Sequence, residues 1–172
     1  MSNVGNIIKA HNSQILSDDQ RKPDKPCDCT TRACPFEGKA ISCNAKNLVY
    51  KAVVKTQQSC NFYIGLSEPE FKKRYNNHMS SFNMDRQLKS MPTRLAAHVR
   101  SLKENNEQFE IDWSVVGRTS ETRDGDATCR LCIREATAIA FAGDGCINRR
   151  SEIANSCRHK RKFLLRTIDA PG

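Results

Sequence analysis

Nine cysteines fall mainly into two clusters along this chain, and any fold has to bring the members of each cluster together. Thiolate and imidazole side chains in sets of four are the usual ligands of tetrahedral zinc. The early set is Cys27, Cys29, Cys34 and Cys43, and the late set is Cys129, Cys132, Cys157 and His159. We therefore predict two zinc sites, the alternative being buried free thiols. Cys60 and Cys146 belong to neither set.

The charge and hydropathy of the chain limit the kinds of molecule that it is expected to bind. With 28 Lys and Arg against 19 Asp and Glu, the 172 residues carry a formal charge of +9. This excess suits a polyanion, with nucleic acid ahead of a membrane surface. No apolar run approaches the roughly 20 residues that cross a bilayer, and the N-terminal segment lacks the apolar core of a signal peptide. We expect a soluble intracellular protein, with no membrane partner and no disulfide framework.

The chain length fits one ordinary domain with an extra arm. Residues 1–26 are polar and without a sustained period, which predicts a flexible or loosely docked arm. Residues 27–46 are expected to form a cysteine-rich zinc knuckle. Residues 47–166 form the main domain, including the second zinc site, and 167–172 are a tail.

Three segments have the residue pattern of strands. Residues 48–54 and 62–67 are rich in β-branched and aromatic side chains and flank a polar turn, which predicts a hairpin. In residues 109–115, apolar and polar side chains alternate as in a half-buried strand. We expect a small three-stranded antiparallel sheet.

Helices are expected after the hairpin and around the third strand. Ser67 and Glu70 have the spacing of a capping box, which predicts a helix start. A second helix begins near Pro92, and a short Ala-rich helix carries Glu135 and has Gly143 as its C-cap. Together with the sheet, these helices predict an α+β fold in which helices flank the strands.

One face of the first helix has an unusual composition. Phe71, Arg74, Tyr75 and His78 are spaced for a single helix face, which combines two aromatic rings with a guanidinium and an imidazole. Phe71 and Tyr75 fit the core. Taken alone, Arg74 and His78 fit either a solvated helix face or a functional site.

The order of these residues resembles a known nuclease family. Leu48-Val49-Tyr50, Tyr63-Ile64-Gly65, Arg74, Glu135 and Asn148 follow one another as in the GIY-YIG nucleases. The first triplet has Leu-Val in place of Gly-Ile, but its tyrosine and the second triplet, with Gly65, are present. Longer stretches, CPFEGKAISC, NLVYKAVV, FYIGLSEPEFKKRYNNHMSSF, CRLCIREATAIA and INRRSEIANSCRHKRKFLL, are similar to the endonuclease segment of Penelope-like retroelements. The resemblance covers roughly residues 27–165.

The resemblance implies roles for individual residues. One Mg²⁺ or Mn²⁺ ion would bind Glu135, and Arg74 would stabilise charge on the phosphate. Tyr50 would be the general base and Tyr63 an orienting partner, although either tyrosine alone also fits a strand aromatic. Asn148 would hydrogen-bond near the site.

The role of Tyr50 depends on a neighbouring charge, and His78 has a further role. A phenol is a weak base at neutral pH, so a cation such as Lys51 or Lys55 would have to lower the pKa of Tyr50. His78 would bind phosphate or carry a proton.

The zinc sites are expected to be structural. The late site would hold the helix of Glu135 in register with the C-terminal segment. The early knuckle would either brace the first strand or contact DNA. Basic residues near the late site fit phosphate contacts, a solvated face or a localisation signal; these are Arg158, Lys160, Arg161 and Lys162.

The sequence thus predicts a metal-dependent endonuclease that nicks double-stranded DNA in the nucleus. The resemblance implies that the nick primes insertion of a retroelement, with a reverse transcriptase domain and element RNA as further partners. One alternative is a catalytically silent, zinc-braced module that binds nucleic acid. Another is a homing or repair nuclease with the same core, in which the two cysteine clusters are not expected.

Overall fold

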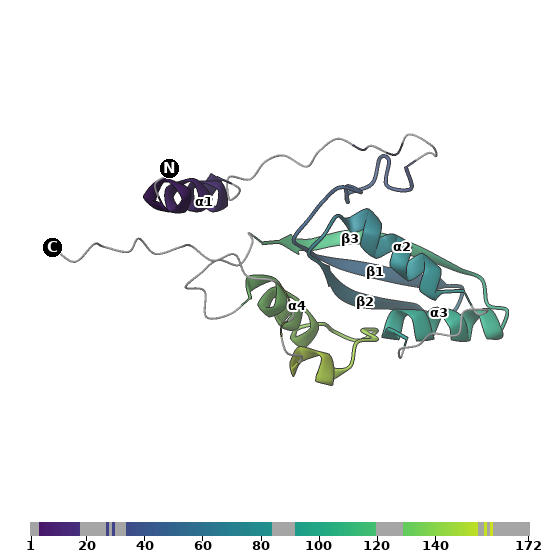
Figure 1. Cartoon of the computed structure of the whole chain (residues 1–172). Coiled ribbons are helices and arrows are strands. Elements are labelled where there is room, and N and C mark those ends of the chain that lie inside the picture. The colour runs from purple at the N-terminus through teal and green to yellow at the C-terminus, as the bar shows by residue number, and fades with distance from the viewer. Residues whose placement is uncertain are drawn as a thin grey trace.

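A three-stranded antiparallel sheet forms the centre of the fold (Figure 1). The computed structural model describes residues 4–17, 27, 29, 34–83, 92–119, 129–154, 157 and 159. The strands are β1 (Leu48–Thr56), β2 (Cys60–Ser67) and β3 (Phe109–Arg118), in the order β2-β1-β3. The predicted hairpin and third strand are confirmed, and so is the α+β class.

The strand register determines which side chains share a face of the sheet. Tyr50 of β1 lies opposite Gly65 of β2, and Ala52 lies between Tyr63 and Trp113. Because side chains alternate along a strand, these residues project from one face and Val49 from the other. The two faces therefore have separate packing partners.

Helices cover both faces of the sheet. On one face, α2 (Phe71–Ser81) and α3 (Arg94–Glu104) pack in a core that includes Tyr50 and Trp113. On the other face, α4 (Arg130–Ala140) packs against Val49 and Ile64. The helices can be followed in Figure 1. A short 3₁₀ helix, η1 (Arg150–Ala154), follows α4.

The ends of two helices differ from the prediction. The N-cap of α2 is Glu70 and makes no side-chain cap hydrogen bond, so the capping box predicted at Ser67 is wrong. Ser67 is the last residue of β2, and its hydroxyl donates to the Pro69 carbonyl at 2.9 Å. The C-cap of α4 is Phe141 rather than Gly143, because the Phe141 N–H already donates to the Thr137 carbonyl.

The N-terminal arm contains a helix that the sequence analysis did not predict. Helix α1 spans Val4–Ser17. Val4, Ile7 and Ile8 have the spacing of one helical face, although Val4 and Ile7 are mostly exposed. Within the described part of the chain, no helix has the length and apolarity required to span a membrane.

Candidate functional site

The hydroxyl group of Tyr50 is the centre of a buried hydrogen-bond network. Tyr50 has 0% exposure. Arg74 Nε donates to Tyr50 Oη at 3.1 Å, and Tyr50 Oη lies 2.6 Å from His78 Nε2. Either Tyr50 Oη or His78 Nε2 donates in the short hydrogen bond, depending on which ring nitrogen of His78 carries the proton. The three side chains form one hydrogen-bonded chain from Arg74 through Tyr50 to His78.

Helix α2 supplies two of these three groups from a single face. Arg74 and His78 are four residues apart, so they lie one turn apart on the same side. The Phe71 ring lies 5.2 Å from the Tyr50 ring and buries the first turn of the helix against the sheet. Packing of Phe71 therefore fixes how close α2 lies to the sheet, and with it the positions of Arg74 and His78 relative to Tyr50.

Burial keeps both partners of the short hydrogen bond neutral. It raises the pKa of Tyr50 to about 12, although the Arg74 charge acts in the opposite direction. Burial, with a further contribution from Arg74, lowers the pKa of His78 to about 3. At neutral pH the network therefore contains a phenol, a neutral imidazole and one guanidinium.

The cation beside Tyr50 is not the one that we predicted. Lys51 Nζ lies 3.8 Å from the centroid of the Phe62 ring, and Lys55 forms a 2.6 Å ion pair with Asp112. Strand alternation places both lysines on the opposite side of β1 from Tyr50. The predicted lowering of the tyrosine pKa by a lysine is therefore wrong.

Gly65 leaves the space that the Tyr50 side chain occupies. A Cβ atom on Gly65 would lie 2.5 Å from Tyr50 Oη and 2.8 Å from Tyr63 Cε1. Tyr63 is also buried, and its ring centroid lies 6.4 Å from that of Tyr50 and 6.1 Å from that of His78. Burial raises the pKa of Tyr63. In the Tyr63-Ile64-Gly65 triplet, the Tyr63 ring thus packs beside the network, and Gly65 leaves the space that the Tyr50 hydroxyl needs.

Glu135 comes from α4 on the other face of the sheet. Helix α4 packs against Ile64 and Leu66 of the edge strand β2, and the Leu66 backbone is a minor influence that lowers the pKa of Glu135. Burial is the largest influence on the carboxyl group and raises its pKa to about 7; Arg74 opposes this shift and Glu152 adds to it. The charge of Glu135 is a minor influence that raises the pKa of Tyr50 and of Arg74.

Asn148 joins the segment after α4 to the edge of the sheet. Its side-chain oxygen accepts from the Ile64 N–H, and its Nδ2 donates to the Ile64 carbonyl, both at 2.8 Å. Nδ2 also donates to Glu152 at 2.7 Å. Next to it, Gly145 and Ile147 form backbone hydrogen bonds with Phe62 of β2. Asn148 thus attaches the segment after α4 to β2.

Glu152 is a site residue that the sequence analysis missed. It lies in η1, is half-buried, and contributes to the raised pKa values of Glu135 and Tyr63. Its spacing of four residues from Asn148 was the available signal, because such a pair faces the same side of a helical turn.

The late Cys/His cluster has the geometry of a zinc site. His159 Nδ1 lies 3.4 Å from the sulfur of Cys129, 3.2 Å from that of Cys132 and 3.5 Å from that of Cys157. The edge of a tetrahedron with zinc bond lengths of roughly 2.3 Å to sulfur and 2.0 Å to nitrogen is about 3.6 Å. These four residues could hold a zinc ion that joins the start of α4 to residues 157 and 159.

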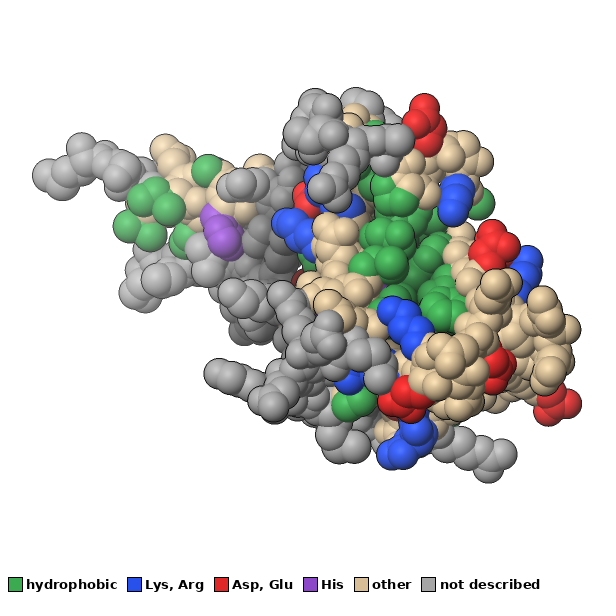
Figure 2. All heavy atoms as spheres, turned by 90° about the vertical axis from the view of Figure 1, so that its right-hand side faces the viewer, with side chains coloured by type: hydrophobic (Ala, Val, Ile, Leu, Met, Phe, Trp, Pro, Cys, Tyr) green, Lys and Arg blue, Asp and Glu red, His purple; other side chains and the backbone are tan. Residues whose placement is uncertain are grey.

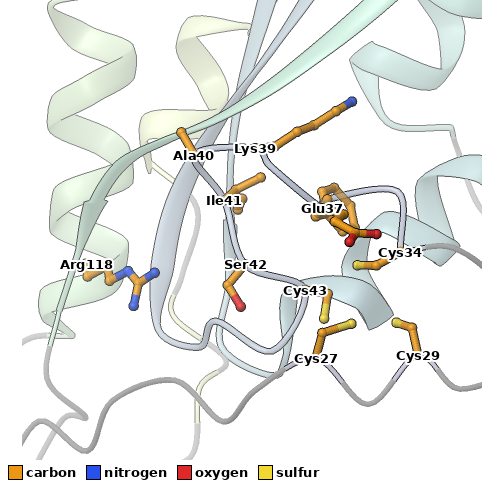
Figure 3. A pocket seen from close by; sticks show the side chains of 11 residues that line it. Cys27, Cys29, Cys34, Glu37, Lys39, Ala40, Ile41, Ser42, Cys43 and Arg118 are labelled. Carbon is orange, nitrogen blue, oxygen red and sulfur yellow. The ribbon is translucent and has the colours of Figure 1, made fainter.

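The early cluster has four sulfur atoms that point toward one another (Figure 3). All four lie within 4.8 Å of one another, at Cys27, Cys29, Cys34 and Cys43. They line a cavity of about 530 Å³. Cys43 is buried in the main core, so a zinc ion here would be attached to the folded domain rather than to a separate arm.

The knuckle also completes the first turn of α2. The Phe71 N–H donates to the Ala45 carbonyl and the Lys72 N–H to the Cys43 carbonyl, both at 2.8 Å. The first N–H groups of a helix have no partner within the helix. The backbone next to the early cluster therefore replaces the missing side-chain cap on the helix that carries Arg74 and His78.

The predicted DNA-contacting residues Arg158, Lys160, Arg161 and Lys162 lie outside the described residues. Among the other predicted site residues, the structure joins Tyr50, Arg74 and His78 by hydrogen bonds and places the Tyr63 ring beside them. Asn148 binds the backbone of β2, and Glu135 comes from the opposite face of the sheet.

These features define a small α+β domain with two Cys/His clusters that could bind zinc. In comparisons with known proteins, no family model, no curated protein and no solved structure matches the chain.

Proposed function

We propose that this protein is a metal-dependent DNA endonuclease of the GIY-YIG type, similar to the nuclease segment of Penelope-like retroelements. The observation that carries the proposal is the buried Tyr50 hydroxyl, which contacts Arg74 at 3.1 Å and His78 at 2.6 Å. Glu135 belongs to the same electrostatic environment. A guanidinium, a proton-transfer pair and a carboxylate are groups that phosphodiester hydrolysis requires.

In the tautomer of His78 that leaves Nε2 unprotonated, the network suits activation of water. As water attacks phosphorus, its proton passes to Tyr50 Oη while the tyrosine proton passes to His78 Nε2. Proton transfer through the pair avoids a free tyrosinate, which the raised pKa of Tyr50 disfavours. It forms an imidazolium at His78, which the lowered pKa of His78 disfavours, so the negative charge of the bound phosphate has to stabilise it. Arg74 stabilises the negative charge on the phosphate oxygens. The bond between phosphorus and the leaving 3′-oxygen breaks, and this oxygen takes a proton from a water molecule to give the 3′-hydroxyl.

Glu135 is the residue that would hold the Mg²⁺ or Mn²⁺ ion. Its carboxyl group is half-buried, and its pKa is raised to about 7 because burial outweighs the opposing charge of Arg74. A divalent cation would compensate the cost of ionising this buried carboxylate. Such an ion, when bound, polarises the phosphate and acidifies bound water. One carboxylate in this position suits a single ion.

The wider biological role rests on the resemblance. The net charge of +9 suits a polyanionic substrate, and double-stranded DNA as this substrate and the nucleus as the place of action follow from the resemblance. The nick would supply a 3′-hydroxyl for reverse transcription, with a reverse transcriptase domain and element RNA as partners. Both zinc ions would be structural.

A second candidate is a catalytically silent zinc-braced module that binds nucleic acid. The observation in its favour is the complete burial of Tyr50, together with the 2% exposure of His78. Unless substrate or water reaches the Tyr50 hydroxyl, these buried side chains can only stabilise the core through their hydrogen bonds.

Nicking of supercoiled plasmid with Mg²⁺ or Mn²⁺ separates the two candidates. The native chain should convert plasmid to the nicked form, and Glu135→Ala and Tyr50→Phe should each reduce the rate by about a hundredfold or more. Glu110→Ala changes an exposed carboxylate on β3 and should leave the rate unchanged. Equal nicking by all four proteins would reject the site. Binding without nicking by any of them would support the silent module.

A further inference from the structure

Glu152 is a half-buried carboxylate that the proposed mechanism does not use. It lies in η1, and its Oε2 accepts a hydrogen bond from Asn148 Nδ2 at 2.7 Å. Figure 2 shows one side of the molecule, on which acidic and basic side chains surround an apolar area. Glu152 differs from such surface carboxylates, because its partner is an amide. Within the described part of the chain, no basic side chain forms an ion pair with it.

The segment that carries Asn148 lies along the outer edge of β2. The Phe62 N–H donates to the Gly145 carbonyl at 2.8 Å, and the Phe62 carbonyl accepts from the Ile147 N–H at 2.9 Å. In an antiparallel pair, the backbone groups of alternate residues point away from the neighbouring strand. The N–H and carbonyl groups of Ile64 therefore face the same outer edge as those of Phe62.

The Asn148 side chain takes the place of the next backbone group on this edge. Its Oδ1 accepts from the Ile64 N–H and its Nδ2 donates to the Ile64 carbonyl, both at 2.8 Å. A carboxamide has the same kind of donor and acceptor as a peptide group, so Asn148 continues the pairing that begins at Phe62. Nδ2 also donates to Glu152, and the Cys146 thiol donates to Oδ1 at 3.5 Å. Both donors and both acceptor positions of the amide are therefore occupied.

The hydrogen bond between Asn148 and Glu152 is the one in this set that involves a carboxylate. Hydrogen bonds to ionised groups are roughly twice as strong as those between neutral groups. The helix η1, which carries Glu152, packs against α4. Glu152 thus connects the amide on the edge of β2 to the helices that follow the sheet.

Ile64 is the middle residue of the triplet beside the Tyr50 hydroxyl. A Cβ atom on its neighbour Gly65 would lie 2.5 Å from Tyr50 Oη, and the ring of its other neighbour, Tyr63, lies 6.4 Å from the Tyr50 ring. The position of β2 therefore determines the space around the hydroxyl. Asn148 holds β2 at Ile64 from the outer edge.

We propose that Glu152 is a positioning residue of the active site, which fixes the Asn148 amide and, through it, the strand β2 beside Tyr50 Oη. This role rests on the proposed function, because that function assigns the reaction to Tyr50 and its neighbours. Glu152 contacts neither the phosphate nor the metal ion. It acts as a hydrogen-bond acceptor, so glutamine, which keeps a side-chain oxygen, can replace it.

Amide hydrogen exchange tests the structural part of the proposal without any nuclease activity. In Glu152→Ala, exchange at the Ile64 N–H should accelerate on the order of tenfold, because Asn148 loses its charged partner. Glu152→Gln should stay within about threefold of the native chain. Exchange at Phe71, whose N–H donates to the knuckle, should stay unchanged in both variants. Ser151→Ala changes an exposed neighbour on η1 and should leave exchange at Ile64 unchanged.

Nicking kinetics and a double variant test whether Glu152 acts through Asn148. In Glu152→Ala, kcat should fall on the order of tenfold while KM for plasmid stays within about twofold, and Glu152→Gln should restore most of kcat. The Tm of Glu152→Ala/Asn148→Ala should be no lower than that of Asn148→Ala, because the two residues share one interaction. Native exchange at Ile64 in Glu152→Ala, no rescue by glutamine, or additive losses of Tm would each overturn the proposal.

The outcomes separate this inference from the proposed function. Faster exchange at Ile64 in Glu152→Ala, with rescue by Glu152→Gln, in a chain that never nicks DNA would support the hold on β2 and reject the nuclease. Nicking that depends on Tyr50 and Glu135, with native kcat and native exchange in Glu152→Ala, would support the nuclease and reject the role of Glu152.

Discussion

At the residue scale, the position of the Tyr50 hydroxyl depends on the absence of a side chain at Gly65. The two residues face each other across β1 and β2, and the hydroxyl occupies the space beside the glycine backbone. Arg74 and His78 both contact that hydroxyl. A side chain at Gly65 would therefore disturb the whole network rather than a single contact.

Gly65→Ala should lower both stability and activity. The new Cβ would lie 2.5 Å from Tyr50 Oη, which forces the ring or the strand to move and costs about 1–3 kcal/mol of unfolding free energy. Thermal unfolding and plasmid nicking measure the two effects. Gly143→Ala is the matched control, because nothing lies within 4 Å of its new Cβ. If both variants unfold at the native Tm, the close packing around Tyr50 is incorrect.

Glu135 should make stability depend on pH in a defined window. Burial raises its pKa in the folded protein from 4.5 to about 7, so the folded state binds more protons than the unfolded state between these values. Its contribution to stability is therefore present below about pH 4.5 and is lost as pH rises to about 7. Glu135→Gln should remove this loss of stability at higher pH, because glutamine does not ionise.

The measurement is the Tm difference between Glu135→Gln and the native chain, without added Mg²⁺ or Mn²⁺. This difference should increase from pH 5 to a plateau above about pH 7.5. Glu110→Gln, at an exposed position, should give a small difference at every pH. A Glu135→Gln difference that does not change with pH would contradict the raised pKa.

At the scale of elements, the early knuckle and helix α2 depend on each other. The carbonyl groups of Cys43 and Ala45 accept from the first two N–H groups of α2, and the Phe36 ring lies 5.2 Å from that of Phe71. The sequence analysis left the knuckle either bracing the first strand or contacting DNA. The observed hydrogen bonds connect it to α2.

Cys43→Ser should remove one of two zinc ions and weaken the start of α2. Metal analysis should give about two zinc ions per native chain and about one in the variant. Hydrogen exchange at the amides of Phe71 and Lys72 should accelerate, because their acceptors lie in or next to the knuckle. Cys60→Ser is the control, since Cys60 belongs to neither cluster. Unchanged zinc content in Cys43→Ser would exclude the early site.

The sequence predicted elements better than their ends. Alternation in 109–115 and the apolar runs around Tyr50 and Tyr63 were sufficient for the three strands, because strand patterns are local. The start of α2 was wrong because its cap comes from residues 43 and 45, which no local pattern indicates. The prediction of a lysine as the cation beside Tyr50 was wrong for the same reason, because the observed cation, Arg74, lies on a different element from the tyrosine.

At the scale of the whole molecule, the proposed site would join elements from both faces of the sheet. Arg74 comes from α2 on one face, Glu135 from α4 on the other, and Asn148 connects the following segment to the edge strand β2. The order of these residues in the sequence indicated the set. It did not indicate Glu152, which enters the site through its hydrogen bond with Asn148.

The ends of the cleaved strand test the central claim most directly. A labelled duplex is incubated with Mn²⁺ and either the native chain or Glu135→Gln, and the termini of the products are identified. A hydrolytic site that primes DNA synthesis predicts 3′-hydroxyl and 5′-phosphate ends from the native chain, with at least about a hundredfold less product from Glu135→Gln. The same ends in equal yield from both proteins, or no cleavage by the native chain, would contradict it.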